Sequence, residues 1–215
     1  MVRACIFDLD GTLMNTIGTI THYLNAALGA HGFAPFGEDR VKYFVGNGAR
    51  LLVERALSAH GALTEENFAA VFATYNELYN AAPNEGSAPY DGILALLDGL
   101  AARGVRVGVL SNKPDFATRA VVASFFGDRV TVAHGGRDGI PLKPAPDGVF
   151  EILRELSLSP SECLYIGDTG VDMETGRAAG IPTVGVLWGF RTREELEMAD
   201  ATHIIAHPSE LLDLI

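Results

Sequence analysis

The chain contains four short apolar runs that show no helical periodicity. They lie at residues 4–7, 105–110, 163–166 and 182–187. Continuous apolar runs of this length, without a 3.6-residue repeat, are typical of strands that are buried on both faces of a sheet. The first run ends at Asp8, so an acidic residue follows the first predicted strand directly.

Amphipathic patterns between these runs predict helices. One pattern spans residues 93–100, a second uses Phe150, Leu153 and Leu156, and a short third pattern ends at Gly180. Strands that alternate with helices of about 10–15 residues indicate a parallel sheet with helices on both faces. The pattern therefore predicts an α/β fold with a doubly wound, Rossmann-like parallel-sheet core.

The stretch 15–83 departs from this alternation, because it shows one helical pattern after another. The clearest pattern has the spacing i, i+3, i+4, i+7, i+10 and i+11, which is typical of an amphipathic helix. It consists of Phe68, Val71, Phe72, Tyr75, Leu78 and Tyr79. We expect a small all-helical domain at 15–83, inserted after the first strand, and a core domain made of 1–14 and 84–215. The turn-rich segment 84–89 is expected to return the chain to the core.

Composition narrows the possible functions. Of the 215 residues, 48% are hydrophobic and 20% are charged, so the chain can bury a core and is neither disordered nor a disulfide-stapled mini-protein. The 27 acidic residues exceed the 16 Lys and Arg residues, which gives a formal charge of −11. This charge repels phosphate backbones and anionic lipid headgroups, so we expect neither nucleic acid nor a membrane as partner.

Cysteine usage and hydropathy bear on location. Cys5 and Cys163 lie within apolar runs, as expected for buried free thiols in a reducing cytosol. No apolar stretch approaches the length of about 18 residues that crosses a bilayer. We expect a cytoplasmic protein, and a monomer and a homodimer are equally compatible with the sequence.

Polar residues follow the predicted strands at their carboxyl ends, where open α/β sheets bind ligands. The first strand is followed by Asp8, Asp10, Gly11 and Thr12, the second by Ser111 and Asn112, and the third by Asp168 and Asp172, while Lys143 precedes a predicted helix.

These residues form a chemically consistent set. Asp8 and Asp10 face the same side of an extended chain. Converging carboxylates repel one another unless a hard cation lies between them, and oxygen ligands without His or Cys favour Mg²⁺. A magnesium ion beside the amides of the turn at 11–12, with Ser111 and Lys143, would bind a phosphoryl group. A carboxylate held against that phosphorus can attack it and form an aspartyl-phosphate.

Each motif alone is weak evidence, because Asp pairs and Ser-Asn pairs mark turns in many proteins. Their joint order resembles that of haloacid dehalogenase-superfamily phosphatases, in the phosphoglycolate-phosphatase-like branch, over essentially the whole chain. The four motifs of this family correspond to DLDGTL at 8–13, Ser111-Asn112, Lys143-Pro144 and GDTGVD at 167–172. Residues 178–186 and Trp188-Gly189 also resemble the branch, and the helical insertion resembles its small cap domain. Many relatives carry an acidic residue where this chain has Asn15-Thr16.

The resemblance implies a role for each motif residue. Asp8 would be the nucleophile and a magnesium ligand, and Asp10 would bind magnesium through its backbone carbonyl and serve as general acid and then general base. Gly11, Thr12, Ser111 and Asn112 would bind the phosphate.

The remaining motif residues would act on charge. Lys143 would neutralise developing charge and hold Asp8, and Asp168 would be a further magnesium ligand. Asp172 would support either the metal ligands or the lysine. Dehalogenase members of the superfamily lack the acid/base residue, so the presence of Asp10 favours phosphate-ester chemistry.

A glycine-bearing loop in the helical insertion is a candidate for substrate recognition. The segment VGNGAR at 45–50 opens a predicted helix, and Arg50 could bind a substrate carboxylate with two hydrogen bonds. The alternative is an ordinary helix N-terminus with a solvated arginine.

Taken together, the motifs predict an Mg²⁺-dependent phosphatase that acts on a small phosphate ester, with 2-phosphoglycolate as the leading substrate. The alternatives in the same superfamily are a pyrophosphatase, a sugar-phosphate phosphatase and a phosphomutase. A phospho-accepting receiver domain is disfavoured, because such domains have only about 120 residues and no large insertion. A catalytically silent partner is disfavoured because every motif carboxylate is present.

Overall fold

The computed structural model describes residues 1–82 and 85–215. The chain divides into two compact units, a core unit of Met1–Asn15 with Ala88–Ile215 and a helical unit of Thr16–Ser87. Of the predicted boundary between the domains, Pro83 and Asn84 lie outside the described residues. In the described part of the chain, each helix is too short or too polar to cross a bilayer.

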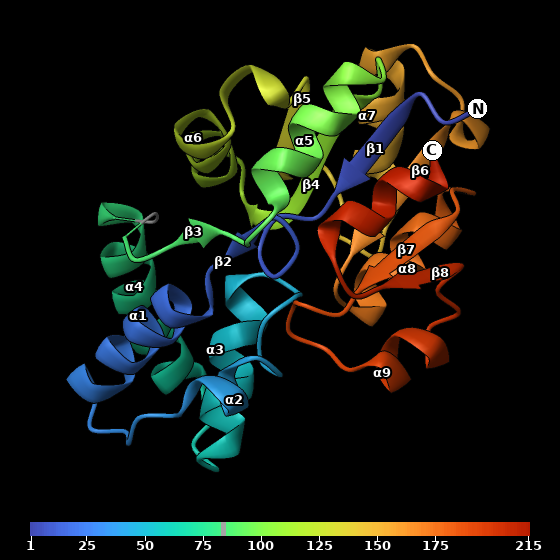
Figure 1. Cartoon of the computed structure of the whole chain (residues 1–215). Helices are drawn as coiled ribbons and strands as arrows, with labels where there is room; N and C mark the ends of the chain where they lie inside the picture. The colour runs from blue at the N-terminus through green and yellow to red at the C-terminus, as the bar shows by residue number, and fades with distance from the viewer. Residues whose placement is uncertain (83–84) are drawn as a thin grey trace. The chain divides into compact units, whose positions relative to one another are not determined.

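The core unit is built on a parallel sheet in the order β5-β4-β1-β6-β7-β8 (Figure 1). Its strands are β1 (Ala4–Phe7), β4 (Arg106–Pro114), β5 (Val132–Gly136), β6 (Cys163–Gly167), β7 (Thr183–Val186) and β8 (His203–Ile205). The chain starts in β1 and adds strands first on one side and later on the other. The strand order therefore reverses around β1, and a crevice for ligands is expected at the carboxyl ends of β1 and its neighbours β4 and β6.

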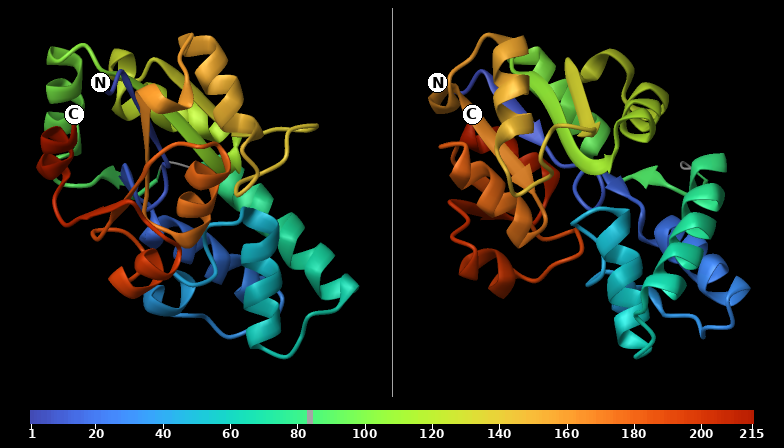
Figure 2. Two further views of the ribbon diagram at one scale, coloured as in Figure 1. Left: turned by 90° about the vertical axis from the view of Figure 1, so that its right-hand side faces the viewer. Right: turned by 180° about the vertical axis from the view of Figure 1, so that it is seen from behind.

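Helices cover both faces of this sheet, as the further views in Figure 2 show. They are α5 (Ile93–Ala102), α6 (Asp115–Phe125), α7 (Asp147–Leu156), α8 (Gly170–Ala178), α9 (Arg193–Met198) and three 3₁₀ turns at Gly127–Arg129, Pro160–Glu162 and Pro208–Leu214.

Alternation along β1 divides the hydrophobic core into two layers. Cys5 and Phe7 pack in the layer that contains the leucines of α5, whereas Ala4 and Ile6 pack in the layer that contains Ile152 of α7. All four residues of β1 are fully buried, which explains why this strand is a continuous apolar run.

A short antiparallel pair of strands forms where the chain leaves the core unit and where it returns to it. It consists of β2 (Met14–Asn15) and β3 (Ala88–Pro89), in which Met14 is opposite Pro89. The segment expected to be a turn-rich return thus contains a strand.

The helical unit consists of α1 (Ile17–Ala30), α2 (Glu38–Val41), α3 (Ala49–Ala59) and α4 (Glu65–Ala81). In α4, the predicted apolar stripe is buried at Val71, Tyr75 and Tyr79. The ring of Tyr79 packs edge-to-face on Tyr23 of α1, with 5.8 Å between ring centroids. Thr64 caps α4 by accepting a hydrogen bond from the Asn67 amide.

Several elements differ from the sequence expectation. The four predicted strands are present, but β5, β8 and helices α6 and α9 had no clear pattern in the sequence. In α7, Phe150 was expected on the buried face but is 44% exposed. The buried apolar side chains of α7 are Val149, Ile152, Leu153 and Leu156, which follow the spacing i, i+3, i+4 and i+7. The face of α7 that packs on the core therefore lies next to Phe150 and does not include it.

Candidate active site

The turn after β1 brings the first motif to the carboxyl edge of the sheet. The amide of Asp8 donates to the carbonyl of Ile166 at 2.8 Å, which keeps this residue in register with β6. The chain then folds back tightly, and the Leu9 carbonyl accepts hydrogen bonds from the amides of Leu13 and Met14. Gly11 has φ +94°, and a Cβ at this position would lie 2.4 Å from an oxygen of Asp168. Both the positive φ and the lack of space for a Cβ require glycine here.

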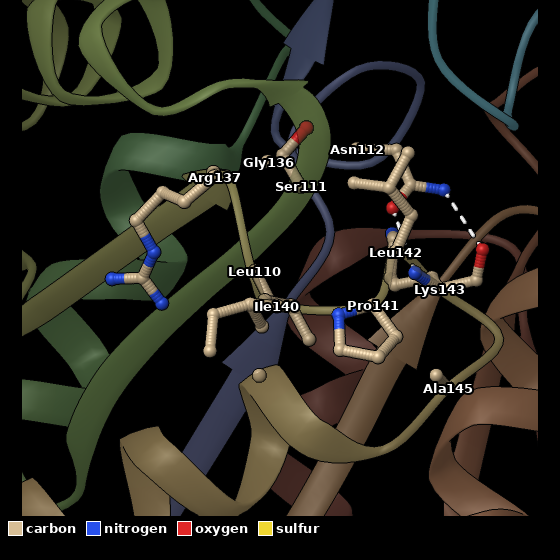
Figure 3. A pocket seen from close by; sticks show the side chains of 12 residues that line it. Leu110, Ser111, Asn112, Gly136, Arg137, Ile140, Pro141, Leu142, Lys143 and Ala145 are labelled. Atoms are coloured by element: carbon tan, nitrogen blue, oxygen red, sulfur yellow. Dashed lines mark hydrogen bonds between the residues drawn. The ribbon is translucent and has the colours of Figure 1, made fainter.

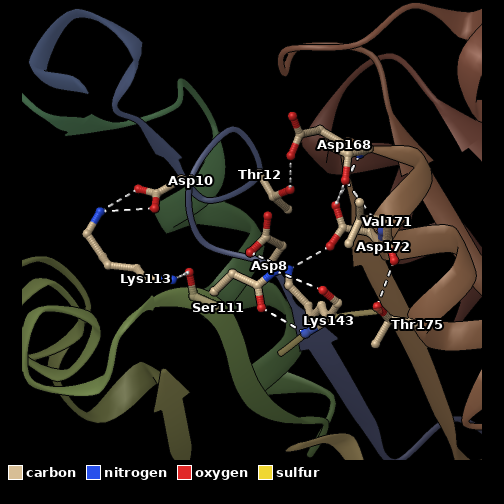
Figure 4. Close-up of polar contacts among 12 residues, drawn as sticks. Asp8, Asp10, Thr12, Ser111, Lys113, Lys143, Asp168, Val171, Asp172 and Thr175 are labelled. Atoms are coloured by element: carbon tan, nitrogen blue, oxygen red, sulfur yellow. Dashed lines mark hydrogen bonds and ion pairs between the residues drawn. The ribbon is translucent and has the colours of Figure 1, made fainter. Parts of the chain in front are cut away.

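Asp168 follows β6 and is fully buried against this turn. Its carboxylate accepts hydrogen bonds from the Thr12 hydroxyl at 2.9 Å and from the Phe190 amide at 2.8 Å (Figure 4). Burial and, after it, the charge of Asp172 raise the pKa of Asp168 to about 7, although these hydrogen bonds oppose the shift.

Gly189 closes the site around Asp168. A Cβ at this residue would lie 2.3 Å from the Asp168 Cβ and 2.4 Å from the Gly11 carbonyl oxygen. The glycine after Trp188 is therefore needed so that two backbone segments can approach the carboxylate closely. Trp188 also fixes the first turn, because its indole N–H donates to the Thr12 carbonyl at 2.9 Å.

Lys143 lies between two carboxylates. Its Nζ is 2.7 Å from an oxygen of Asp8 and 2.7 Å from an oxygen of Asp172. Burial lowers the pKa of Lys143, but the charges of Asp172 and Asp8 outweigh it and hold the pKa well above its ordinary value. Burial raises the pKa of Asp8, and Lys143 opposes that shift. The lysine is thus a charged group in a buried acidic site.

Asn112 fixes the main chain of Lys143. The amide of Lys143 donates to the Asn112 side-chain oxygen at 2.8 Å, and the Asn112 side-chain nitrogen donates to the Lys143 carbonyl at 3.1 Å. The peptide bond between Lys143 and Pro144 is cis. The side chain of Asn112 therefore positions the lysine, and the expected binding of phosphate by Asn112 stays a prediction.

Asp172 is occupied on both oxygens. One oxygen contacts Lys143, and the other accepts hydrogen bonds from the Thr169 amide at 3.1 Å and the Thr169 hydroxyl at 2.7 Å. Thr169 and Asp172 form the capping box at the N-terminus of α8. We expected Asp172 to support either the metal ligands or the lysine, and the structure shows direct contact with the lysine.

Ser111 and Asp10 lie on the other side of Asp8. Ser111 is buried near the end of β4, and its hydroxyl oxygen accepts a hydrogen bond from the Lys113 amide at 3.2 Å. The carboxylate of Asp10 contacts the Lys113 ammonium at 2.7 and 3.0 Å. We assigned no role to Lys113 from the sequence. Its position two residues after Ser111, at the end of a predicted strand, was the available signal.

A hollow adjoins Ser111 and Lys143 on the core unit (Figure 3). Apart from these two residues its lining is mostly apolar or glycine, and it includes Leu110, Ile140, Pro141, Leu142, Gly135 and Gly136.

The acidic residues fit a magnesium ion. Carboxylate oxygens of Asp8, Asp168 and Asp172 all lie within 4.8 Å of one another, and all three residues are buried. The donors are oxygen atoms alone, which Mg²⁺ prefers. Asp8 and Asp168, which we expected as magnesium ligands, both belong to this cluster and would hold the ion, while Asp172 contacts Lys143.

Arg50 belongs to the helical unit, in the first turn of α3. Its guanidinium pairs with Glu54 at 2.8 Å and lies 4.6 Å from the ring centroid of Phe68. Its side chain is 69% exposed. These contacts are internal to the helical unit, and a role of Arg50 toward a ligand stays a prediction.

Comparisons with known proteins agree with this geometry. The family model of haloacid dehalogenase-like hydrolases matches residues 5–186. A phosphoglycolate phosphatase of Rhodospirillum rubrum is 39% identical over 197 residues, which cover 88% of this chain and 81% of the relative. A phosphoglycolate phosphatase of Yersinia pseudotuberculosis is 33% identical and covers all of this chain and 93% of its own.

A solved structure shows the same fold. The crystal structure of a protein from Lactobacillus delbrueckii subsp. bulgaricus superposes with a TM-score of 0.96 at 31% identity, covering 99% of this chain and 98% of its own. The family match spans the residues from β1 to β7, and so includes the whole acidic site. The chain therefore belongs to the haloacid dehalogenase-like hydrolases.

Proposed function

We propose that this hydrolase is a magnesium-dependent phosphatase that cleaves a small phosphomonoester through an aspartyl-phosphate on Asp8. One observation carries the proposal. Asp8 lies at the carboxyl end of the central strand, with its carboxylate 2.7 Å from the ammonium of Lys143 and clustered with Asp168. A carboxylate in this setting is surrounded by the groups that phosphoryl transfer needs.

The residues of the site divide the chemistry between them. An oxygen of Asp8 attacks phosphorus while the bond to the leaving oxygen breaks, and Asp10 gives that oxygen a proton so that it departs as an alcohol. Asp10 then takes a proton from water as the water attacks the acyl phosphate, which releases inorganic phosphate and restores Asp8. When bound, magnesium supplies positive charge that offsets the phosphate oxygens and the carboxylates.

Positive charge and hydrogen-bond donors of the chain itself support the same steps. Lys143 holds one oxygen of Asp8 in place and offsets charge as it accumulates on the transferring group. The Ser111 hydroxyl, which is buried, would donate a hydrogen bond to a phosphate oxygen. The amides of the turn at 11–12 are further donors at this edge of the sheet.

The substrate proposed is 2-phosphoglycolate. The support comes from relatives at 39% and 33% identity over most of this chain that bear the name phosphoglycolate phosphatase. Arg50 is our candidate for the substrate carboxylate, because its guanidinium is largely exposed.

The test is phosphate release from a panel of 2-phosphoglycolate, pyrophosphate, sugar phosphates and p-nitrophenyl phosphate, with Mg²⁺ or with EDTA. We expect release that requires Mg²⁺ and is greatest for 2-phosphoglycolate. Asp8→Asn should abolish it, whereas Asp98→Asn, a matched change at an exposed ion pair with Arg129, should leave it intact. Turnover by Asp8→Asn would refute the nucleophile, and preference for pyrophosphate or a sugar phosphate would refute the substrate.

A further inference from the structure

Asp10 is held by a residue outside the four motifs. Both of its carboxylate oxygens contact Nζ of Lys113, at 2.7 and 3.0 Å. In the described part of the chain, the Asp10 carboxylate has no other hydrogen-bond or ion-pair partner. Figure 4 shows the side chain turned toward Lys113 and away from the cluster around Asp168. The orientation of Asp10 therefore depends on this one contact.

Lys113 itself is fixed. Its amide donates to the Ser111 hydroxyl at 3.2 Å, and its carbonyl accepts a hydrogen bond from the Thr118 hydroxyl at 3.3 Å. The next strand packs so closely that a Cβ on Gly135 would lie 2.6 Å from the Lys113 carbonyl oxygen. The side chain of Lys113 is only 3% exposed and that of Asp10 14%, so the pair is shielded from water. Close packing around a buried side chain on a fixed backbone limits its motion, so Lys113 can hold Asp10 in one place.

The fold explains how two residues 103 positions apart meet. Strands β1 and β4 are parallel neighbours, in which Phe7 is opposite Val109. Asp10 and Lys113 follow these two residues by three and four positions. They reach the same edge of the sheet because the two strands are parallel and in this register.

We infer that Lys113 is a positioning residue for Asp10, which fixes the carboxylate of Asp10 where it meets the leaving oxygen of the substrate. The inference rests on the proposed function, in which Asp10 donates a proton to that oxygen. In the absence of Lys113 the Asp10 side chain is free to rotate, and the proton donor is correctly placed for only part of the time. The loss then falls on kcat, since no contact to the phosphate is removed.

Substrates with different leaving groups distinguish the positioning of Asp10 by Lys113 from a purely structural role of Lys113. An alkoxide is a strong base and needs a proton as it departs, whereas p-nitrophenolate leaves without one. In the step that forms the aspartyl-phosphate, which kcat/KM reports, a residue that acts through Asp10 therefore matters for alkyl phosphates and matters little for p-nitrophenyl phosphate. The later attack of water, in which Asp10 is the base, is common to both substrates and affects kcat for both. A general defect in packing would reduce both reactions equally.

The experiment compares wild type, Lys113→Met, Asp10→Asn and the double variant on 2-phosphoglycolate, or on the alkyl phosphate that wild type hydrolyses faster, and on p-nitrophenyl phosphate. For Lys113→Met we expect kcat/KM to fall about tenfold or more on the alkyl phosphate and less than about threefold on p-nitrophenyl phosphate. The double variant should be no slower than Asp10→Asn, because both changes remove the same step. Lys42→Met, a lysine paired with an exposed aspartate, serves as control.

Equal losses of kcat/KM on the two substrates, or additive losses in the double variant, would overturn the positioning role. If Lys113→Met fails to fold, Lys113→Arg keeps the positive charge but moves it relative to Asp10, and it is expected to lose more kcat/KM on the alkyl phosphate than on p-nitrophenyl phosphate. Lys113→Arg with a uniform loss would equally overturn the inference. An Asp10→Asn protein with full activity on the alkyl phosphate would refute the acid role of the proposed function itself, and the inference with it.

Discussion

Replacing Lys143 by methionine removes the positive charge at the centre of the site while nearly preserving side-chain volume. In the structure, Nζ of Lys143 is 2.7 Å from both Asp8 and Asp172, and the three side chains are at most 9% exposed. The variant leaves these carboxylates together with that of Asp168, all within 4.8 Å, without their shared cation. We expect a large loss of stability.

The size of this loss follows from the burial of the pair. Removing one partner of a buried ion pair typically costs about 3–5 kcal/mol, because the remaining charge stays desolvated. Protonation of a carboxylate limits that cost. In the metal-free variant, the folded state binds protons more tightly than the unfolded state, so stability falls as pH rises above the unfolded carboxylate pKa of about 4. We therefore expect a loss of about 3–5 kcal/mol at pH 8 and a smaller loss at pH 5.5.

The assay is urea unfolding in EDTA at both pH values. Fluorescence of Trp188 reports on the core unit, since its indole is hydrogen-bonded to Thr12 beside the site. Lys42→Met is the control, because Lys42 is 33% exposed and its partner Asp39 is 99% exposed; the change should cost less than about 1 kcal/mol. A loss for Lys143→Met below about 1 kcal/mol at pH 8, or one that is larger at pH 5.5, would refute the reasoning.

Three further predictions follow from contacts in the core unit. Gly189→Ala should lower stability and Mg²⁺ affinity, because its Cβ would lie 2.3 Å from that of Asp168; urea unfolding and Mg²⁺ titration measure the two effects. Asn112→Ala should cost about 1–3 kcal/mol in urea unfolding and reduce kcat, because the buried main-chain groups of Lys143 lose their partners. The increase in Tm caused by Mg²⁺ should be greater at pH 8 than at pH 5.5. The metal-free folded state binds a proton at Asp168 with a pKa of about 7, above the unfolded value. The stability of the metal-free protein therefore falls as pH rises toward 7, and below pH 7 Mg²⁺ competes with protons for Asp168.

Each of these predictions has a result that contradicts it. Gly104 has positive φ and open space around it, so Gly104→Ala measures the effect of backbone strain alone. If Gly104→Ala lowers Mg²⁺ affinity as much as Gly189→Ala does, the close contact between residue 189 and Asp168 does not explain the loss. Full activity of Asn112→Ala would show that Lys143 needs no support from this side chain. An increase in Tm with Mg²⁺ that is independent of pH, or that persists in Asp168→Asn, would remove Asp168 from the binding site.

Local sequence patterns were sufficient for the frame of the core and for most of its candidate site. The strands β1, β4, β6 and β7 are apolar runs because both of their faces are buried, and this composition is visible without any structure. Asp8, Ser111 and Asp168 could be grouped because parallel strands end at the same edge of a sheet.

Edge strands and the buried faces of helices were harder to predict from the sequence. β5 reads Val-Ala-His-Gly-Gly, which lacks an apolar run, and it is a strand because its backbone pairs with β4 at the edge of the sheet. Gly135 is required there by the close approach of Asp115 and Lys113, which no pattern near Gly135 reveals. Phe150 was assigned to the buried face of α7 because hydrophobicity does not distinguish neighbouring positions on a helix; packing against β5 decided it.

The sequence by itself thus determined which residues form the candidate site, because each motif is a local feature at the end of a predictable strand. Only the tertiary structure decided how the charges are paired. Lys143 is shared between Asp8 and Asp172, and Lys113 binds Asp10 from 103 residues away. Pairing of this kind depends on strand order and register, which arise from contacts between segments remote in the chain, and the nearest-neighbour pattern of residues does not contain it.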